Sequence, residues 1–189
     1  LMPLDAPVRP IGPDETLVFS QKEMLGSASY DHVVVGPGQV FFIGTIPTLS
    51  PPFEEVLPVP RDAVVWIVDT ICALLLPSAV GGIPDDVFAV NLDRQDAPLR
   101  LRRSAQIGGP GEQGFTLFHR GMRGAGAAFL STAWSDRLLF DGGLYPCLRQ
   151  LASEWSTARN QPGPRKEAFE IRPNWMGRSP AETPPPAQE

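Results

Sequence analysis

The chain has 189 residues, of which 42% are apolar and 20% charged, and its net charge is −5. This balance is typical of one globular domain, because a chain of this length buries enough surface to fold without a disulfide staple. The two cysteines, Cys72 and Cys147, lie in apolar stretches, so we expect buried free thiols and a reducing location such as the cytoplasm. Cysteine usage therefore argues against a secreted disulfide scaffold.

Proline is frequent in the chain, and both ends are rich in it. Residues 1–15 hold four prolines, which predicts an extended arm. Residues 16–172 carry the hydrophobic patterns expected of a single domain. Residues 173–189 form a second Pro-rich segment, expected to be disordered in isolation and to contact another chain through Trp175.

A strand at 16–20 and a hairpin are the first elements expected in the domain. Residues 32–35 and 39–46 are rich in β-branched and aromatic side chains, as strands are. The segment Gly36-Pro37-Gly38 between them predicts a tight turn.

Two neighbouring segments are less regular. In residues 21–30, the sequence QKEML could begin one helical turn that Gly26 would end. Residues 47–60 contain five prolines, and this density predicts a loop because proline lacks a backbone donor.

Residues 61–76 are predicted to form a buried helix bounded by prolines. Its apolar run covers most of the helix surface, so we expect cover on more than one side, and it is shorter than the ~20 residues needed to span a bilayer. Asp62 and Asp69 lie on one narrow face. They are either the wet side of the helix, which we favour, or partners of an arginine from further along the chain.

The second half of the domain is predicted to be a meander of antiparallel strands followed by a helix. Residues 144–159 repeat apolar side chains every three or four positions, and Leu148, Leu151 and Trp155 should face the core. The expected strands are 87–92, 98–103, 115–119, 127–132, 137–140 and a last one at 168–172. The fold class is therefore α+β, with a mainly antiparallel sheet of about six to eight strands and two packed helices.

Candidate catalytic groups are few. The only histidines are His32 and His119, and no nucleophile elbow or metal-binding spacing accompanies them. His119 is the candidate general base, because Arg120 and Arg123 nearby could hold an anion. Gly-rich segments at 108–114 and 121–126 lack the lysine and the following helix of a phosphate loop. We therefore predict no metal and no cofactor.

Basic residues gather between positions 93 and 123. Arg100 and Arg102 are two apart, which places them on one face of a strand, and Phe115 and Phe118 are nearby aromatic residues. A basic face with aromatic residues is either a solvated surface, a site for an acidic patch of a protein, or a site for single-stranded nucleic acid. The net charge of −5 and the isoelectric point of about 5.1 disfavour nucleic acid. The candidate binding residues are Arg100, Arg102, Arg103, Arg120, Arg123 and Trp175.

These patterns lead to one preferred function and two alternatives. We expect a non-enzymatic protein–protein interaction or assembly subunit of a larger complex, such as a virion or a secretion apparatus, with a protein partner or a second copy of the chain. The alternatives are a hydrolase or transferase without a standard motif, and a nucleic-acid-binding module that uses the arginine-rich strand face.

Overall fold

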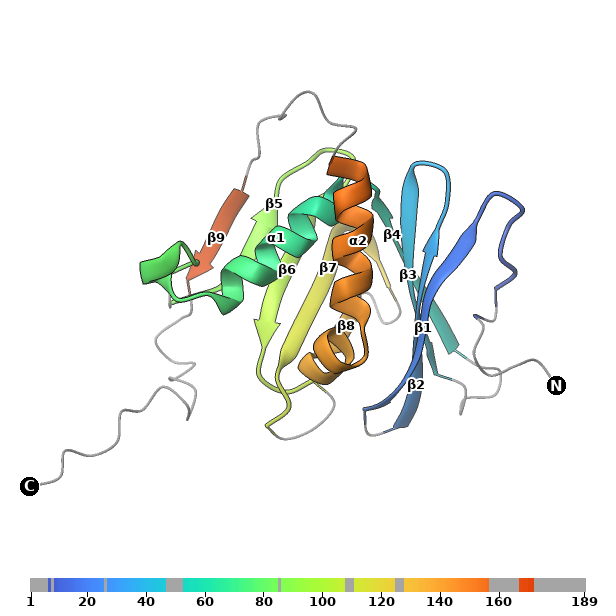
Figure 1. Cartoon of the computed structure of the whole chain (residues 1–189), viewed down its shortest axis with the longest axis horizontal. Coiled ribbons are helices and arrows are strands. Elements are labelled where there is room, and N and C mark those ends of the chain that lie inside the picture. The colour runs from blue at the N-terminus through green and yellow to red at the C-terminus, as the bar shows by residue number, and fades with distance from the viewer. Residues whose placement is uncertain are drawn as a thin grey trace, which may run out of the picture.

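A computed structural model of the chain shows two antiparallel β-sheets and two main helices (Figure 1). The expected α+β class with mainly antiparallel strands is therefore confirmed, with the strands divided between two sheets. Eight strands supply four to each sheet, and a short ninth strand extends the second one. The structure describes residues 7, 9–25, 27–46, 53–84, 86–107, 111–124, 128–156 and 167–171.

The first sheet is a four-stranded meander. Its strands follow chain order: β1 (Thr16–Leu25), β2 (Ser27–Val35), β3 (Gln39–Ile46) and β4 (Phe53–Pro60). The expected hairpin joins β2 to β3, and Gly38 takes the positive φ of 76° that its turn requires. The possible helical turn at 21–25 does not form, because those residues extend β1 and pair with β2.

The loop expected at 47–60 is wrong in its second half. Residues 53–60 form β4, which pairs with β3 along its whole length. Proline is tolerated here because β4 is an edge strand, so one side of its backbone has no neighbour that needs a donor. Pro58 lies opposite Phe41, and Pro60 lies opposite Gln39. Residues 47–52 lie outside the described part of the chain.

The second sheet is the expected meander, extended at one edge by the C-terminal strand. Its order is β8-β7-β6-β5-β9. The strands are β5 (Val87–Leu92), β6 (Leu99–Ser104), β7 (Gly114–Arg123), β8 (Phe129–Ser135) and β9 (Glu167–Ile171).

The strand expected at 137–140 is a single π-helical turn instead, η3 (Arg137–Asp141). Leu138 and Leu139 are both buried, which a strand with alternating faces would not achieve. The hydroxyl of Ser135 accepts a hydrogen bond from the Leu138 N–H at 3.0 Å, and this bond starts the turn.

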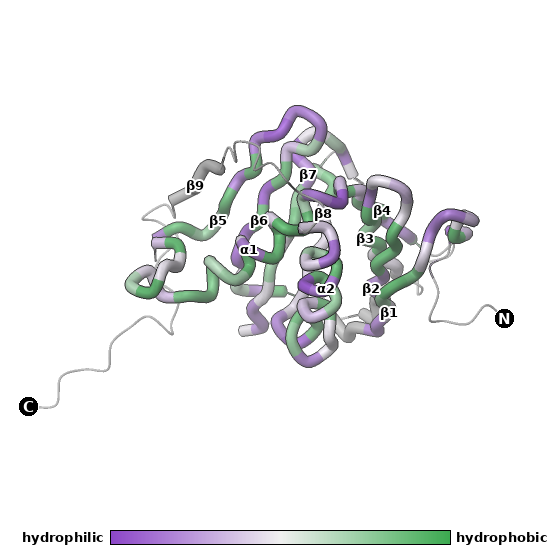
Figure 2. Tube along the Cα trace, turned by 45° about the horizontal axis from the view of Figure 1, so that its top comes forward, coloured by the Kyte–Doolittle hydropathy of each residue, from purple (hydrophilic) through white to green (hydrophobic). Residues whose placement is uncertain are grey.

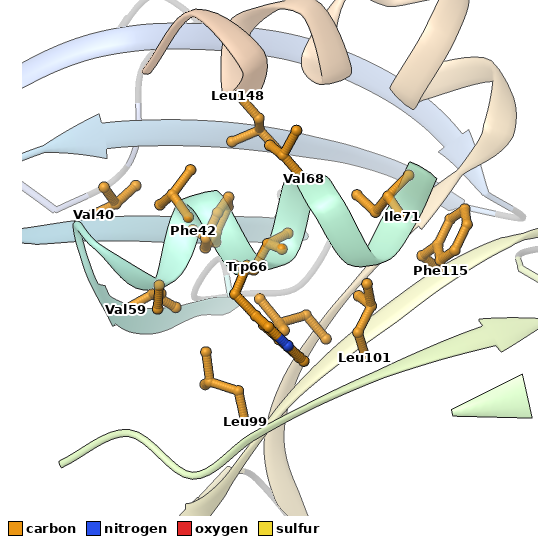
Figure 3. Packing of buried hydrophobic residues seen from close by; sticks show 14 of the residues in the cluster. Val40, Phe42, Val59, Trp66, Val68, Ile71, Leu99, Leu101, Phe115 and Leu148 are labelled. Atoms are coloured by element: carbon orange, nitrogen blue, oxygen red, sulfur yellow. The ribbon is translucent and has the colours of Figure 1, made fainter. Parts of the chain in front are cut away.

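Helix α1 (Ala63–Leu75) is the centre of the core, and α2 (Leu144–Ser156) packs beside it. Helix α1 lies against one face of the second sheet, and α2 lies on the same side of that sheet, packed against α1 and the η3 turn (Figure 1). Val64, Ile67 and Ile71 of α1 are fully buried. The cover expected on several sides of this helix comes from the chain itself. Figure 3 shows side chains around α1 from the first sheet (Val40, Phe42, Val59), from the second (Leu99, Leu101, Phe115) and from α2 (Leu148).

The acidic residues of α1 take different roles. Asp62, just before the helix, accepts a hydrogen bond from Arg94 Nη1 at 2.7 Å, so one carboxylate does pair with an arginine of the basic segment. Asp69 is exposed, as expected for the wet side. Cys72 is also exposed, so its expected burial is wrong, and Cys147 is half-buried. Sequence alone missed this because Cys72 lies on the wet side of the helix, three residues after Asp69.

An aromatic contact joins the two sheets. Phe42 of β3 and Trp134 of β8 have ring centroids 5.1 Å apart, and both are almost completely buried. Trp155 on α2 was expected in the core but is half-buried, with the guanidinium of Arg61 5.3 Å from its ring centroid. The other two residues predicted for that face, Leu148 and Leu151, are buried.

The described part of the N-terminal arm lies against the first sheet. Pro7 is buried, and the guanidinium of Arg9 lies 4.8 Å from the ring centroid of Phe41. The Arg9 backbone N–H donates to Glu54 of β4 at 3.1 Å, and the Arg9 side chain pairs with Glu15 at 3.0 Å. Residues 1–6 and the C-terminal segment 172–189, with its expected contact to another chain, lie outside the described residues.

We predict that the two tryptophans contribute unequally to stability. Trp134→Ala should lower the free energy of unfolding by about 3–5 kcal/mol, because it opens a cavity between the sheets. Trp155→Ala should cost only roughly 1–2 kcal/mol, because part of that ring is already exposed to water. Urea denaturation of both variants measures the difference, and equal losses would contradict the inter-sheet role of Trp134.

Candidate interaction site on the second sheet

The second sheet has one face covered by helices and one face that no described helix covers (Figure 1). Successive side chains of strand β6 point alternately to these two faces. Leu99 and Leu101 are fully buried on the helix side, whereas Arg100 and Arg102 are half-buried on the opposite face. The predicted placement of these two arginines on one strand face is therefore confirmed.

Phe118 of β7 lies between the two arginines on the open face. It pairs with Arg100 in the strand register. The guanidinium carbon lies 5.9 Å from the ring centroid for Arg100 and 5.2 Å for Arg102, within the range of cation–π contacts. We call these three residues the Arg–Phe cluster. It presents two cations and an apolar ring on a rigid sheet.

Two hydroxyl groups hold Arg102 in place. Its Nε donates to Ser104 Oγ at 3.3 Å, and this oxygen lies 3.0 Å from Thr116 Oγ1 in a buried pair. Ser104 follows Arg102 by two positions, and Thr116 is the cross-strand partner of Arg102, so all three share one face. Sequence reasoning missed this support, because it depends on the register between β6 and β7.

Arg103 has a different role from its neighbours. It lies on the helix side of β6, where its Nη1 and Nη2 atoms donate to the two carboxylate oxygens of Asp136 at 2.5 and 2.7 Å. Its guanidinium is also 4.7 Å from the ring centroid of Phe115, and Nη2 donates to Gln113 at 2.7 Å. This bidentate pair fastens β6 to the residue that follows β8.

The remaining predicted binding residues do not join the cluster. Arg120 forms an ion pair with Asp93. Arg123 stands at the far end of β7, 4.5 Å from the ring centroid of Phe129. Trp175 lies outside the described residues. The structure thus brings together Arg100 and Arg102 among the predicted binding residues.

His119, the candidate base, is 7% exposed and lies on the helix side of β7. Its Nδ1 accepts a hydrogen bond from the Gly121 N–H at 3.2 Å. Burial lowers the pKa of His119 below its ordinary value of 6.5, because the charged imidazolium is poorly solvated there. Arg120 follows on the opposite face of the strand, so the structure does not assemble the proposed anion site around this ring.

The other histidine forms a pair that sequence reasoning did not find. His32 of β2 lies opposite Ser20 of β1, and its Nδ1 is 3.0 Å from Ser20 Oγ. The hairpin separates the two residues in sequence, so only the strand register reveals the pair. Asp31, the nearest acid in sequence, lies on the other face of β2 because successive side chains alternate.

The described residues hold neither a metal-binding group nor a membrane-spanning helix. Within that part of the chain, no three His, Cys, Asp or Glu side chains are grouped so that they could hold a metal ion. Among the helices it contains, none has the length and apolar character to cross a membrane. Comparisons with family models, curated proteins and solved structures found no match to the chain.

The buried state of His119 predicts a pH effect on stability. The unfolded chain takes up a proton at this residue more readily than the folded protein, so its contribution to stability is present above the ordinary pKa of 6.5 and is lost as the pH falls. His119→Gln should therefore show a smaller loss of unfolding free energy than wild type between about pH 7.5 and 5. Urea denaturation across this range tests it, and parallel curves for the two proteins would contradict it.

Proposed function

We propose that the protein is a non-enzymatic interaction subunit whose Arg–Phe cluster binds an acidic segment of a protein partner. The observation that carries this proposal is the placement of Arg100, Arg102 and Phe118 together on the sheet face that no described helix covers. The two guanidinium groups can bind carboxylates, and the partly exposed ring between them can contact an apolar side chain.

Neighbouring arginines have roles within the fold. Three other arginines, Arg94, Arg103 and Arg120, each pair with one or two aspartates of the chain. These pairs fasten loops and strand ends to one another. Arg100 and Arg102 have contacts within the chain as well, but they stack on an aromatic ring and remain partly exposed on the flat of the sheet.

A short acidic protein segment fits the cluster better than a nucleic acid does. The net charge of −5 repels any polyanion, and this repulsion is largest for a long phosphate backbone. Nucleic-acid binding draws its affinity mainly from many lysine and arginine contacts to phosphates. Two arginines beside one ring are enough to recognise a short run of carboxylates.

The two free thiols favour a reducing compartment for this interaction. Cys72 and Cys147 are free, and Cys72 is exposed. An exposed free thiol is typical of a reducing compartment, so we place the interaction in the cytoplasm.

Binding of a fluorescein-labelled oligoglutamate peptide tests the proposal. We expect fluorescence anisotropy to show binding by the wild-type chain at low ionic strength. The double variant Arg100→Gln, Arg102→Gln should bind roughly ten- to a hundredfold more weakly, because two charge-assisted contacts are lost. A matched control, Arg137→Gln with Arg149→Gln, removes the same charge from exposed positions elsewhere and should bind like wild type.

Two results would contradict the proposal. Equal weakening in both double variants would mean that only net charge matters. Tighter binding of an oligothymidylate than of the peptide, abolished by the Arg100 and Arg102 changes, would favour the nucleic-acid alternative.

A further inference from the structure

A second surface, at the opposite end of α1 from Asp62, is apolar and exposed. Leu75 is 43% exposed, Leu76 42% and Val80 66%. We call these three residues the end patch. Three large apolar side chains within six positions are more than the scattered exposure usual on a protein surface. In Figure 2 hydrophobic residues follow α1 to this end of the molecule, beside β5.

The end patch is held in place by the backbone around it. Helix α1 ends at Leu75, Pro77 follows, and a single 3₁₀ turn, η1 (Ser78–Val80), reverses the chain. The Ile83 N–H then donates to the carbonyl of Ala73 at 2.9 Å, which folds the segment back onto the helix. The patch is therefore a fixed feature of the fold.

We propose that the end patch is the docking site for residues 172–178 of the same chain, with Trp175 and Met176 on Leu75, Leu76 and Val80. The proposal does not use the Arg–Phe cluster, so each can fail without the other. Residues 172–178 lie outside the described part of the chain, but the residue at which they start and the side chains they carry are known.

The starting point of the segment is fixed by β9. Ile171, the last residue of β9, pairs with Val87 at the beginning of β5. Val87 follows the end patch by only seven positions, and its N–H bonds back to Pro84 at 2.9 Å. Trp175 comes four residues after Ile171, so it can lie up to about 14 Å from the end of β9. That reach suits a site on the adjacent turn.

The charge and the apolar residues of segment 172–178 also suit the end patch and its surroundings. Residues 172–178 (RPNWMGR) contain two arginines and no acid, and Trp175 and Met176 are the only large apolar residues after position 171. Asp86, which precedes Val87, is exposed. Because Val87 pairs with Ile171, Arg172 would follow β9 at the position opposite this carboxylate. Pro173 also limits the backbone freedom lost on docking.

Docking within one chain is favoured over docking between copies. A short tether gives the segment an effective concentration in the millimolar range at its own patch. Burying a tryptophan there would remove the exposed apolar surface from water.

Trypsin cleavage between Arg178 and Ser179, followed by mass spectrometry on the full chain, tests whether residues 172–178 dock on the end patch. Cleavage needs the segment to leave the patch, so its rate follows the undocked population. Val80→Ser should speed this cleavage by roughly five- to tenfold, and Trp175→Ala should do the same. Val18→Ser, at a 38% exposed position on β1, is the matched control and should cleave at the wild-type rate.

The melting temperature of each variant shows whether it has kept its fold. Equal cleavage rates for wild type and folded Val80→Ser would overturn the proposal. Protection that rises with protein concentration would also overturn it, because the segment would then dock on a second copy.

Discussion

Burial of α1 on nearly all sides is the constraint on which the rest of this structure depends. Its apolar residues cover most of the helix surface, and Val64, Ile67 and Ile71 are fully buried. Each large apolar side chain moved out of water contributes about 1.5–3 kcal/mol. No single sheet can surround a helix, so the two sheets and α2 must all pack against it, as Figure 3 shows. Phe42 and Trp134 close the contact between the sheets.

The same constraint decides which surface is open. Because α1 packs on one face of the second sheet and α2 packs on α1 from the same side, the other face is left without a helix in the described structure. Strand β6 connects the two sides directly, since Leu99 and Leu101 enter the core while Arg100 and Arg102 face outward. A register shift of one residue would bury the arginines and expose the leucines, so core packing fixes the geometry of the Arg–Phe cluster.

Elements encoded by local patterns could be predicted from the sequence. The β2–β3 hairpin has its Gly-Pro-Gly turn between β-rich runs, and both helices have clear boundaries or periodicity. Strand β4 was missed because proline is allowed there only by the edge position, which is a property of the sheet. The segment 137–140 was read as a strand because its apolar run is too short to separate a strand from a helical turn.

The site could be predicted only in part, for a related reason. Alternation along one strand was enough to place Arg100 and Arg102 on a common face. Arg103 and Arg120 differ from Arg100 and Arg102 because they form ion pairs with Asp136 and Asp93. Those contacts depend on the folded arrangement, so the sequence alone does not reveal them. The Ser20–His32 pair likewise depends on the register of two strands.

The central claim is that α1 makes the two sheets one cooperative unit. It is tested most directly by amide hydrogen exchange in the variant Ile67→Ala, compared with wild type. The account predicts that the slowest amides of β2–β3 and of β6–β7 lose protection together, by the same free energy of about 2–5 kcal/mol expected for a buried isoleucine. Loss of protection in one sheet while the other keeps its wild-type exchange rates would contradict it.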